Sequence, residues 1–446
     1  MAAPVKYQGW IVSGFFNGLQ KLSVPVFGIV TTMILAKEAL TKTEMGVWAL
    51  FLVVTSFIEL IRQALVKTSL IKFVNHSPQE DHKYVLSAAF FLNIIITLLL
   101  VLILVVFAPQ FASWLKAPEL KEMLYIFAIG ILVLIPFSHF EWIMYSKSDF
   151  KGLFATYFYR QAIALVLMVV VVLLYKKISL NTLVIFYCLG ILLGAAIGYR
   201  YVRRHLTHTF ILKKEWFSRL WHFGKYVFGS GVSTLVFANA GQMMLSPILG
   251  STAFTASQSI AARVINLSDM PSQVVSDILF PKSANRENAA NKDLIRFYYE
   301  KSVGATLCFC IPMVLFILLF PKFIILFLAD AQYLDAIPYL RIIAITAIFL
   351  AYLKQWGVII DSSGRPQVNF LLITFIAILN VVLTYFFITG MGFLGAAYAL
   401  LISHVVAFVI TQWLLHKYYG IRFMQCFKYA FEFYPELTKI ILQKIR

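Results

Sequence analysis

Long apolar stretches recur along the whole chain and limit its fold more than any other feature. The chain has 446 residues, of which 61% are hydrophobic, and its mean hydropathy is +0.83. Such a chain has too few polar side chains to cover a globular surface in water. A run of about 20 apolar residues is long enough to cross a bilayer as an α-helix. The sequence therefore predicts an all-α polytopic membrane protein.

Twelve stretches have the length and hydropathy of a transmembrane helix, six in each half of the chain. In the first half they are Gly9–Leu35, Glu44–Ile71, Lys83–Ala108, Leu120–Tyr145, Leu153–Tyr175 and Ser179–Tyr199. In the second half they are Trp221–Leu249, Thr252–Phe280, Phe297–Phe320, Leu334–Ile360, Val368–Thr389 and Phe393–His416. The first stretch is too long for a cleavable signal peptide and lacks a small-residue processing site, so we expect it to stay in the protein.

The distribution of Lys and Arg among the loops predicts the orientation. Short loops rich in these residues stay on the cytoplasmic side during insertion. The loops that would share a side with the N-terminus contain most of them, including Lys67, Lys147, Arg204 and Lys213, whereas the opposite loops contain few. We expect both termini to be cytoplasmic. The same bias, together with anionic lipid, explains the net charge of +18 without a nucleic-acid partner.

The two halves of the chain share features at equivalent positions. Phe107-Ala-Pro-Gln-Phe111 closes the third stretch and Phe320-Pro-Lys-Phe323 closes the ninth, while Trp142 near the end of the fourth matches Trp356 in the tenth. Such repeats are typical of transporters. We predict two six-helix bundles, 1–210 and 211–417, related by a pseudo-two-fold axis along the membrane normal with a central cleft between them. Residues 418–446 are expected to form a cytoplasmic amphipathic tail, interrupted at Pro435.

Cationic side chains inside the apolar stretches point to function. Each costs about 2.5–3.5 kcal/mol at the centre of a membrane helix, so several together indicate a hydrated, positively charged interior suited to an anion. The predicted substrate-binding residues of this cationic cavity are Lys21, Arg62, Arg160, Arg263, Arg341 and Lys354. Polar residues expected to line the same cavity are Asn17, Gln20, Asn239, Gln242, Asn266 and Gln273.

For several of these cations an alternative explanation stays open. Arg263 could form an internal salt bridge instead of contacting substrate, and Arg62 could pair with Glu59 three residues earlier on the same helix. Arg160 and Lys354 could extend to the lipid headgroups. Lys21, near the middle of its stretch and one turn before Pro25, is the first candidate for a substrate contact.

Acidic residues in the stretches are fewer than the cations. Glu59, Asp269 and Asp277 could bind H⁺ or Na⁺ during transport, although pairing between helices explains such acids equally well. Glu141 is a further acid at membrane depth. Cys188, Cys308, Cys310 and Cys426 lack metal or redox spacing, so we expect no metal, no catalytic residue and no cofactor beyond a coupling ion.

Four short motifs, in this order within twelve spans, carry a resemblance to a known family. They are Thr43-Glu-Met-Gly-Val-Trp-Ala-Leu50, Leu279-Phe-Pro-Lys-Ser-Ala284, Asp361-Ser-Ser-Gly-Arg-Pro366 and Gly392-Phe-Leu-Gly-Ala-Ala-Tyr398. The whole chain thereby resembles the O-antigen-type flippases, a polysaccharide-exporter branch of the multidrug/oligosaccharidyl-lipid/polysaccharide superfamily.

The resemblance implies a carrier that moves an undecaprenyl-pyrophosphate-linked oligosaccharide to the periplasmic leaflet by alternating access. It also implies basic residues on the first, second and eighth helices around a central cavity, the helices that contain Lys21, Arg62 and Arg263. The expected partners are the lipid-linked oligosaccharide of O-antigen, capsule or exopolysaccharide, anionic membrane lipids and the glycan polymerase or assembly machinery. We expect a monomer.

Two other functions compete with this interpretation. A cation-coupled multidrug exporter of the same superfamily would need an acid-rich cavity, and the excess of cations in the spans argues against it. A membrane-embedded glycan polymerase or ligase would need a long periplasmic loop with catalytic residues, and the predicted outer loops are short. We therefore expect a transporter and not an enzyme.

Overall fold

The computed structural model of the chain describes residues 4–207, 209, 211–270, 272–273, 275–276, 291–362 and 365–445. Side chains at residues 4–15, 226, 268, 362, 366 and 436–445 lie outside this description.

The described residues form α-helices and short connections, with no strand among them. The helices of the N-terminal part are α1 Pro4–Ile34, α2 Lys42–Arg62, α3 Thr68–His76, α4 His82–Trp114, α5 Leu120–Ser146, α6 Phe150–Tyr175, α7 Leu180–Val202 and α8 Lys214–Leu249. Those that follow are α9 Ala253–Ser268, α12 Lys292–Leu319, α13 Pro321–Leu328, α14 Ala336–Ser362, α15 Pro366–Met391, α16 Phe393–Tyr419 and α17 Phe423–Ile445. Short π-helical turns extend α1 through Leu35–Ala39 and join α2 to α3 through Gln63–Lys67.

Eleven helices of the described part are long and apolar enough to cross a membrane, and each coincides with a predicted span. The remaining predicted span, Thr252–Phe280, begins with α9, and its last residues, from Asp277 on, lie outside the described residues. The all-α polytopic fold is thus confirmed. One boundary differs from expectation, because α2, the π-helical turn and α3 form one continuous span, Lys42–His76. Lys67, which we counted with the cytoplasmic loops although the predicted span Glu44–Ile71 includes it, lies inside this helical span.

Local sequence explains where several helices begin and end. Thr41 caps α2 by accepting a hydrogen bond from the backbone N–H of Glu44, whose carboxylate in turn accepts from the backbone N–H of Thr41. This reciprocal arrangement satisfies two backbone donors that the first helical turn leaves open. Asp149 caps α6 in the simpler way, through the N–H of Gly152. Gly420 ends α16 with a φ of 66°, a left-handed conformation that glycine adopts without strain.

The contacts divide the chain into two compact units. Unit 1 contains Met1–Leu235 and Ser251–Ala256, and unit 2 contains Val236–Gly250 and Ser257–Arg446. The division falls inside α8, and residues 418–446 belong to unit 2. The grouping into two six-helix bundles stays a prediction.

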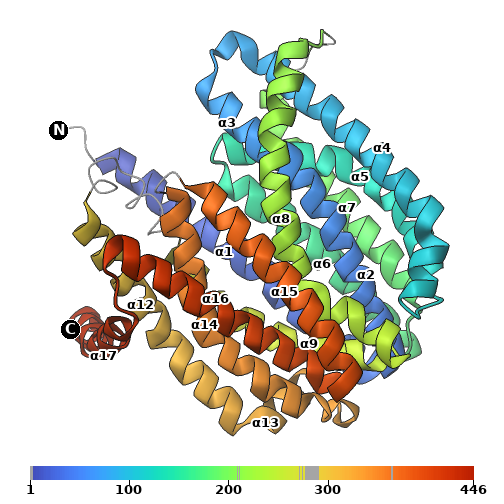
Figure 1. Cartoon of the computed structure of the whole chain (residues 1–446). Coiled ribbons are helices and arrows are strands. Elements are labelled where there is room, and N and C mark those ends of the chain that lie inside the picture. The colour runs from blue at the N-terminus through green and yellow to red at the C-terminus, as the bar shows by residue number, and fades with distance from the viewer. Residues whose placement is uncertain are drawn as a thin grey trace. The chain divides into compact units, whose positions relative to one another are not determined.

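In unit 1, α5 packs against α4 and α7, and α6 packs against α7 and α1 (Figure 1). Its core contains Trp142, which is fully buried among apolar residues of α3, α4 and α5. Between membrane helices, contacts of this kind stabilise mainly through van der Waals packing.

In unit 2, α14 packs against α12 and α16, and α16 packs against α15. Tyr299, Tyr352 and Trp356 are almost completely buried in its core.

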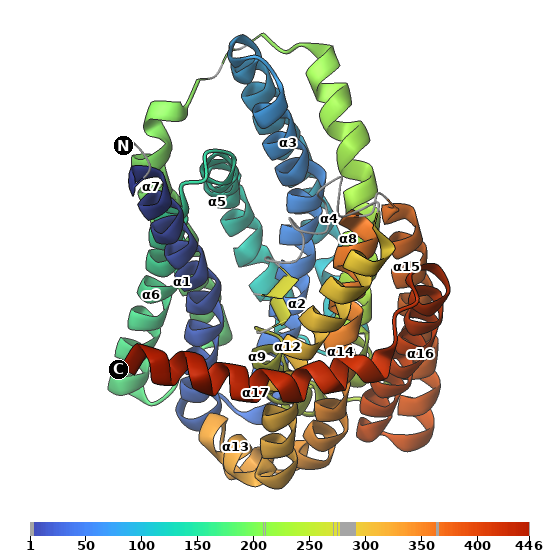
Figure 2. The same ribbon diagram turned by 90° about the vertical axis from the view of Figure 1, so that its left-hand side faces the viewer.

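The C-terminal helix α17 crosses unit 2 over α12 (Figure 2). Gly304 of α12 allows this contact, because a Cβ atom there would lie 2.6 Å from the Cβ of Tyr429. Further along, the hydroxyl of Tyr434 donates a hydrogen bond to the carbonyl of Cys308 at 2.7 Å. The helix continues through Pro435, so the interruption that we expected there was wrong.

Candidate functional site

The first candidate, Lys21, lies near the middle of α1 and is exposed. Asn17, four residues earlier, is part-buried and shares its helix face, since residues i and i+4 lie above one another. Leu22 and Val26, exposed by 49% and 52%, occupy another face. The polar stripe of α1 is therefore separate from its exposed apolar stripe. Gln20, also predicted to line the cavity, is buried.

Arg62 of α2 is buried inside unit 1, with 1% of the residue exposed. Its Nε and Nη2 donate to the side-chain oxygen of Asn93 at 3.2 and 2.9 Å, and Nε also donates to the hydroxyl of Thr97 at 3.0 Å. The carbonyl of Leu134 accepts a further bond from Nη2 at 2.8 Å. Arg62 thus joins α2 to α4 and α5 and does not line an open cavity in this conformation. Its contact with substrate stays a prediction.

Glu59 pairs with Arg160 of α6, and not with Arg62 on its own helix. The Nη2 of Arg160 lies 2.8 Å from the Oε1 of Glu59 and 2.9 Å from the hydroxyl of Tyr187. The guanidinium also lies 4.8 Å from the centre of the Phe137 ring, where a cation is attracted to the aromatic face. Only 6% of the Arg160 side chain is exposed, compared with 27% of Glu59. These contacts do not match extension of Arg160 to the lipid headgroups, and its contact with substrate stays a prediction.

A second ion pair in unit 1 joins Lys67 to Glu141 of α5 at 2.9 Å. The Lys67 Nζ also lies 3.9 Å from the centre of the Tyr145 ring. The Glu141 side chain is 2% exposed. Sequence reasoning missed this pair because it assigned Lys67 to a loop. The signal for it was the unexplained acid at position 141, next to the buried Trp142.

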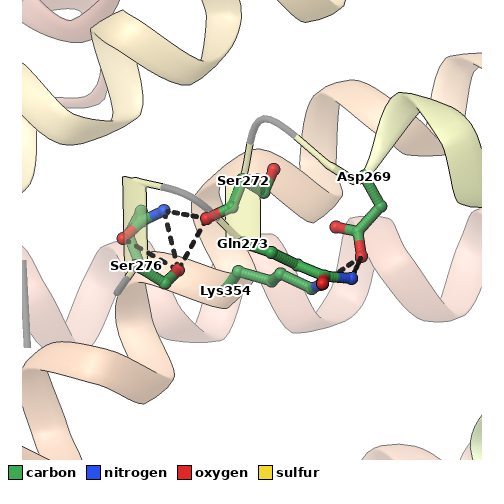
Figure 3. Close-up of polar contacts among 6 residues, drawn as sticks. Asp269, Ser272, Gln273, Ser276 and Lys354 are labelled. Atoms are coloured by element: carbon green, nitrogen blue, oxygen red, sulfur yellow. Dashed lines mark hydrogen bonds and ion pairs between the residues drawn. The ribbon is translucent and has the colours of Figure 1, made fainter. Parts of the chain in front are cut away.

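In unit 2, Asp269 lies at the centre of a small polar cluster (Figure 3). Its carboxylate forms an ion pair with Lys354 of α14 and accepts a hydrogen bond from the side-chain nitrogen of Gln273 at 3.1 Å. The Lys354 side chain remains 30% exposed. The structure thus brings together three of the predicted site residues, two as an ion pair and one as a donor to the acid.

Gln355, the residue after Lys354, bonds to two serines, Ser272 and Ser276, which Figure 3 labels. Its amide nitrogen donates to the carbonyl of Ser272 at 3.4 Å and to the hydroxyl of Ser276 at 3.2 Å. Gln355 is fully buried and precedes Trp356, just as Glu141 precedes Trp142 in unit 1. In each unit the residue before the buried tryptophan therefore bonds to the second predicted span of its half. Glu141 bonds to Lys67 in the span Glu44–Ile71, and Gln355 bonds to Ser272 and Ser276 in the span Thr252–Phe280.

The remaining predicted residues come from α8, α9 and α14 and the segment after α9. Arg263 of α9 is part-buried and Asn266 is exposed, while Asn239 and Gln242 of α8 are part-buried. Arg341 is exposed in the second turn of α14. Asp277 lies outside the described residues. Within the described part, His, Cys, Asp and Glu do not assemble in groups that could hold a metal ion.

Relatives of known fold are membrane transporters. The chain has a TM-score of 0.77 to the lipid II flippase MurJ in an inward closed conformation, at 15% identity over 96% of this chain and 92% of that one. Its TM-score to an inward-facing multidrug resistance MATE transporter of the MOP superfamily is 0.75, at 15% identity over 89% and 95% of the two chains. These likenesses show a shared fold.

Sequence comparison gives the family. An uncharacterized membrane protein of Methanocaldococcus jannaschii is 24% identical over 225 residues, which are 49% of this chain and 44% of that protein. The chain thus spans less than half the length of this curated relative. The sequence profile described as polysaccharide biosynthesis protein matches residues 34–338. The chain therefore belongs to the polysaccharide biosynthesis protein family of multi-pass membrane proteins, with the fold of the MOP transporters.

Proposed function

We propose that the chain is a flippase for an undecaprenyl-pyrophosphate-linked oligosaccharide, such as an O-antigen, capsule or exopolysaccharide repeat unit. It moves this substrate across the bacterial inner membrane by alternating access, with both termini in the cytoplasm. The family's link to polysaccharide biosynthesis and the fold shared with a lipid II flippase support this proposal.

One observation carries the preference for an anionic substrate. The predicted intramembrane acids in the described part of the chain, Glu59, Glu141 and Asp269, are each paired with a cation of their own unit. Lys21 is exposed near the middle of α1, on the same helix face as Asn17. A carboxylate that is already neutralised offers little to a cationic drug, whereas an exposed cation attracts a pyrophosphate.

An exposed cation within the spans suits the transport of a pyrophosphate group across a bilayer. A pyrophosphate group loses its hydration in hydrocarbon at a prohibitive free-energy cost, and basic and polar side chains replace part of that hydration. The polyprenyl tail can stay in the lipid throughout. Because no covalent bond changes, the flippase needs no catalytic group. Coupling to H⁺ or Na⁺ through Glu59, Asp269 or Asp277 remains a prediction.

Reconstituted vesicles test the proposal. The purified protein is incorporated into liposomes with a fluorescent undecaprenyl-pyrophosphate oligosaccharide, and a membrane-impermeant quencher reports the fraction of substrate on each leaflet. We expect protein-dependent translocation of this lipid and little translocation of the same glycan on an uncharged polyprenol. Efflux of a cationic dye from the same vesicles without movement of the pyrophosphate lipid would instead identify a multidrug exporter.

A further inference from the structure

A cavity of about 210 Å³ lies at the end of unit 1 where α3 meets α4 and where α5 and α7 end. Under the proposed orientation this end faces the cytoplasm. The cavity is bounded by Lys147 at the end of α5, by Arg204 and His205 after α7, and by His82 at the start of α4. None of the described residues that line it is acidic. Four side chains that carry or can carry positive charge therefore face one small space.

Two neighbouring cavities at the same end differ in charge. The cavity of about 490 Å³ is lined by Glu80 and Asp81 as well as by lysines, and the cavity of about 400 Å³ by Asp81 and Glu215. The cationic lining is thus a property of one cavity and not of this whole face of the protein. General attraction of basic residues to anionic lipid would not by itself produce that segregation.

The floor of the cavity is apolar. Val74, Leu86 and Ile143 line it, and all three belong to the buried core of unit 1. A cleft with one sign of charge and low-dielectric walls strengthens the field on a counter-ion inside it. Gln79 and Thr207 add polar groups at the rim.

Described residues of the connection after α7 contact α4 and the short turn before it. The backbone N–H of Thr209 donates to the hydroxyl of Ser87 at 2.8 Å, and Lys213 forms an ion pair with Asp81 at 3.3 Å. The Nζ of Lys213 also lies 3.9 Å from the centre of the Tyr84 ring. These contacts hold Thr209 and Lys213, which follow Arg204 and His205 in the chain, against α4 and the turn before it.

We propose that this cavity binds a phosphate group. Arginine presents a planar fork that matches phosphate oxygens and lysine supplies a point charge, so Arg204 and Lys147 are the main ligands, and the two histidines add donors when protonated. The phosphate can come from an anionic phospholipid headgroup of the adjoining leaflet or from a soluble phosphate compound. This site is separate from the intramembrane cations, and binding to it does not depend on the proposed transport activity.

The test measures binding to the full-length protein in neutral detergent, with inorganic pyrophosphate as the probe in a calorimetric titration. The variant Lys147→Gln/Arg204→Gln removes two cations that line the cavity. The matched control, Lys151→Gln/Arg203→Gln, removes two exposed cations of the same kinds that lie nearby in the sequence and do not line it. We expect the first variant to weaken binding about tenfold or more, as the loss of charge-assisted hydrogen bonds requires, and the control to change it less than about twofold.

A second arm separates the two phosphate sources. Native mass spectrometry of protein taken from nanodiscs with equal phosphatidylglycerol and phosphatidylcholine shows which lipid stays bound. If the wild type retains phosphatidylglycerol and Lys147→Gln/Arg204→Gln does not, the cavity is a phospholipid site. If the wild type binds pyrophosphate but retains no phosphatidylglycerol, the cavity is a site for soluble phosphate. If the double variant has a lower melting temperature than the wild type, the single variant Arg204→Gln replaces it in both binding measurements. Equal losses in the double variant and its control, or binding of neither probe by the wild type, would overturn the proposal.

Discussion

At the scale of single residues, the charges in the spans differ in how far they are buried. Arg62, Arg160 and Lys67 are held by partners on other helices of unit 1, so they join helices. Lys21 is exposed on the polar face of α1, and its contact with substrate stays a prediction. A charge inside an apolar stretch is therefore not by itself a sign of a binding site, because a buried ion pair also explains it.

The Glu59–Arg160 pair allows a prediction about stability. In Glu59→Gln the guanidinium of Arg160, with 6% of its side chain exposed, loses its charged partner, which costs up to about 3–5 kcal/mol in a buried pair. Because Glu59 is 27% exposed, solvent screening should reduce this loss. We expect a lower melting temperature in detergent for Glu59→Gln and a partial recovery in Glu59→Gln/Arg160→Gln. Additive losses in the double variant would show that the two residues are not coupled.

At the scale of helices, hydropathy predicts the elements well and their partners poorly. The predicted spans match eleven helices because each depends only on a local run of apolar residues. The partner of Lys67 is 74 residues away, which no local pattern reports. The continuity of α17 through Pro435 was missed for the same reason, since the contacts of this helix with α12 offset the roughly 3 kcal/mol that an interior proline costs.

The contact between α12 and α17 can be tested at its closest point. In Gly304→Val the new side chain would overlap Tyr429, so we expect α17 to detach, at a cost of about 1–3 kcal/mol for overpacking. Limited trypsin digestion should then cut at Lys428 faster than in the wild type. The control is Gly390→Val, because a Cβ at Gly390 meets nothing within 4 Å. Equal digestion of both variants would contradict the close packing at Gly304.

At the scale of the whole molecule, the two halves retain a common plan in their polar contacts. Glu141 and Gln355 each precede a buried tryptophan and each bond to the segment of the second span of their half. The sequence reveals the matching tryptophans. It does not reveal that the neighbouring residue is bonded in both halves, since one contact is an ion pair and the other a neutral hydrogen bond.

The orientation of the protein in the membrane can be tested by labelling single cysteines. In a background with Cys188 replaced by serine, Lys116→Cys should react with a membrane-impermeant maleimide in intact cells, and Lys214→Cys only after the cells are permeabilised. The other native cysteines should react slowly because Cys308, Cys310 and Cys426 are buried, and burial raises the pKa of the Cys426 thiol. The reverse labelling pattern would mean that the basic end of unit 1 faces the periplasm.

The central claim is that an exposed mid-span cation contacts the pyrophosphate during translocation, and the initial rate of flipping by Lys21→Gln in vesicles tests it most directly. We expect this rate to fall at least about tenfold, because one charge-assisted hydrogen bond contributes roughly 1.5–3 kcal/mol. The melting temperature should stay unchanged, Lys21→Arg should keep most of the activity, and Lys121→Gln, at an exposed lysine near the start of α5, should behave as the wild type. Wild-type flipping by a fully folded Lys21→Gln protein would contradict the claim.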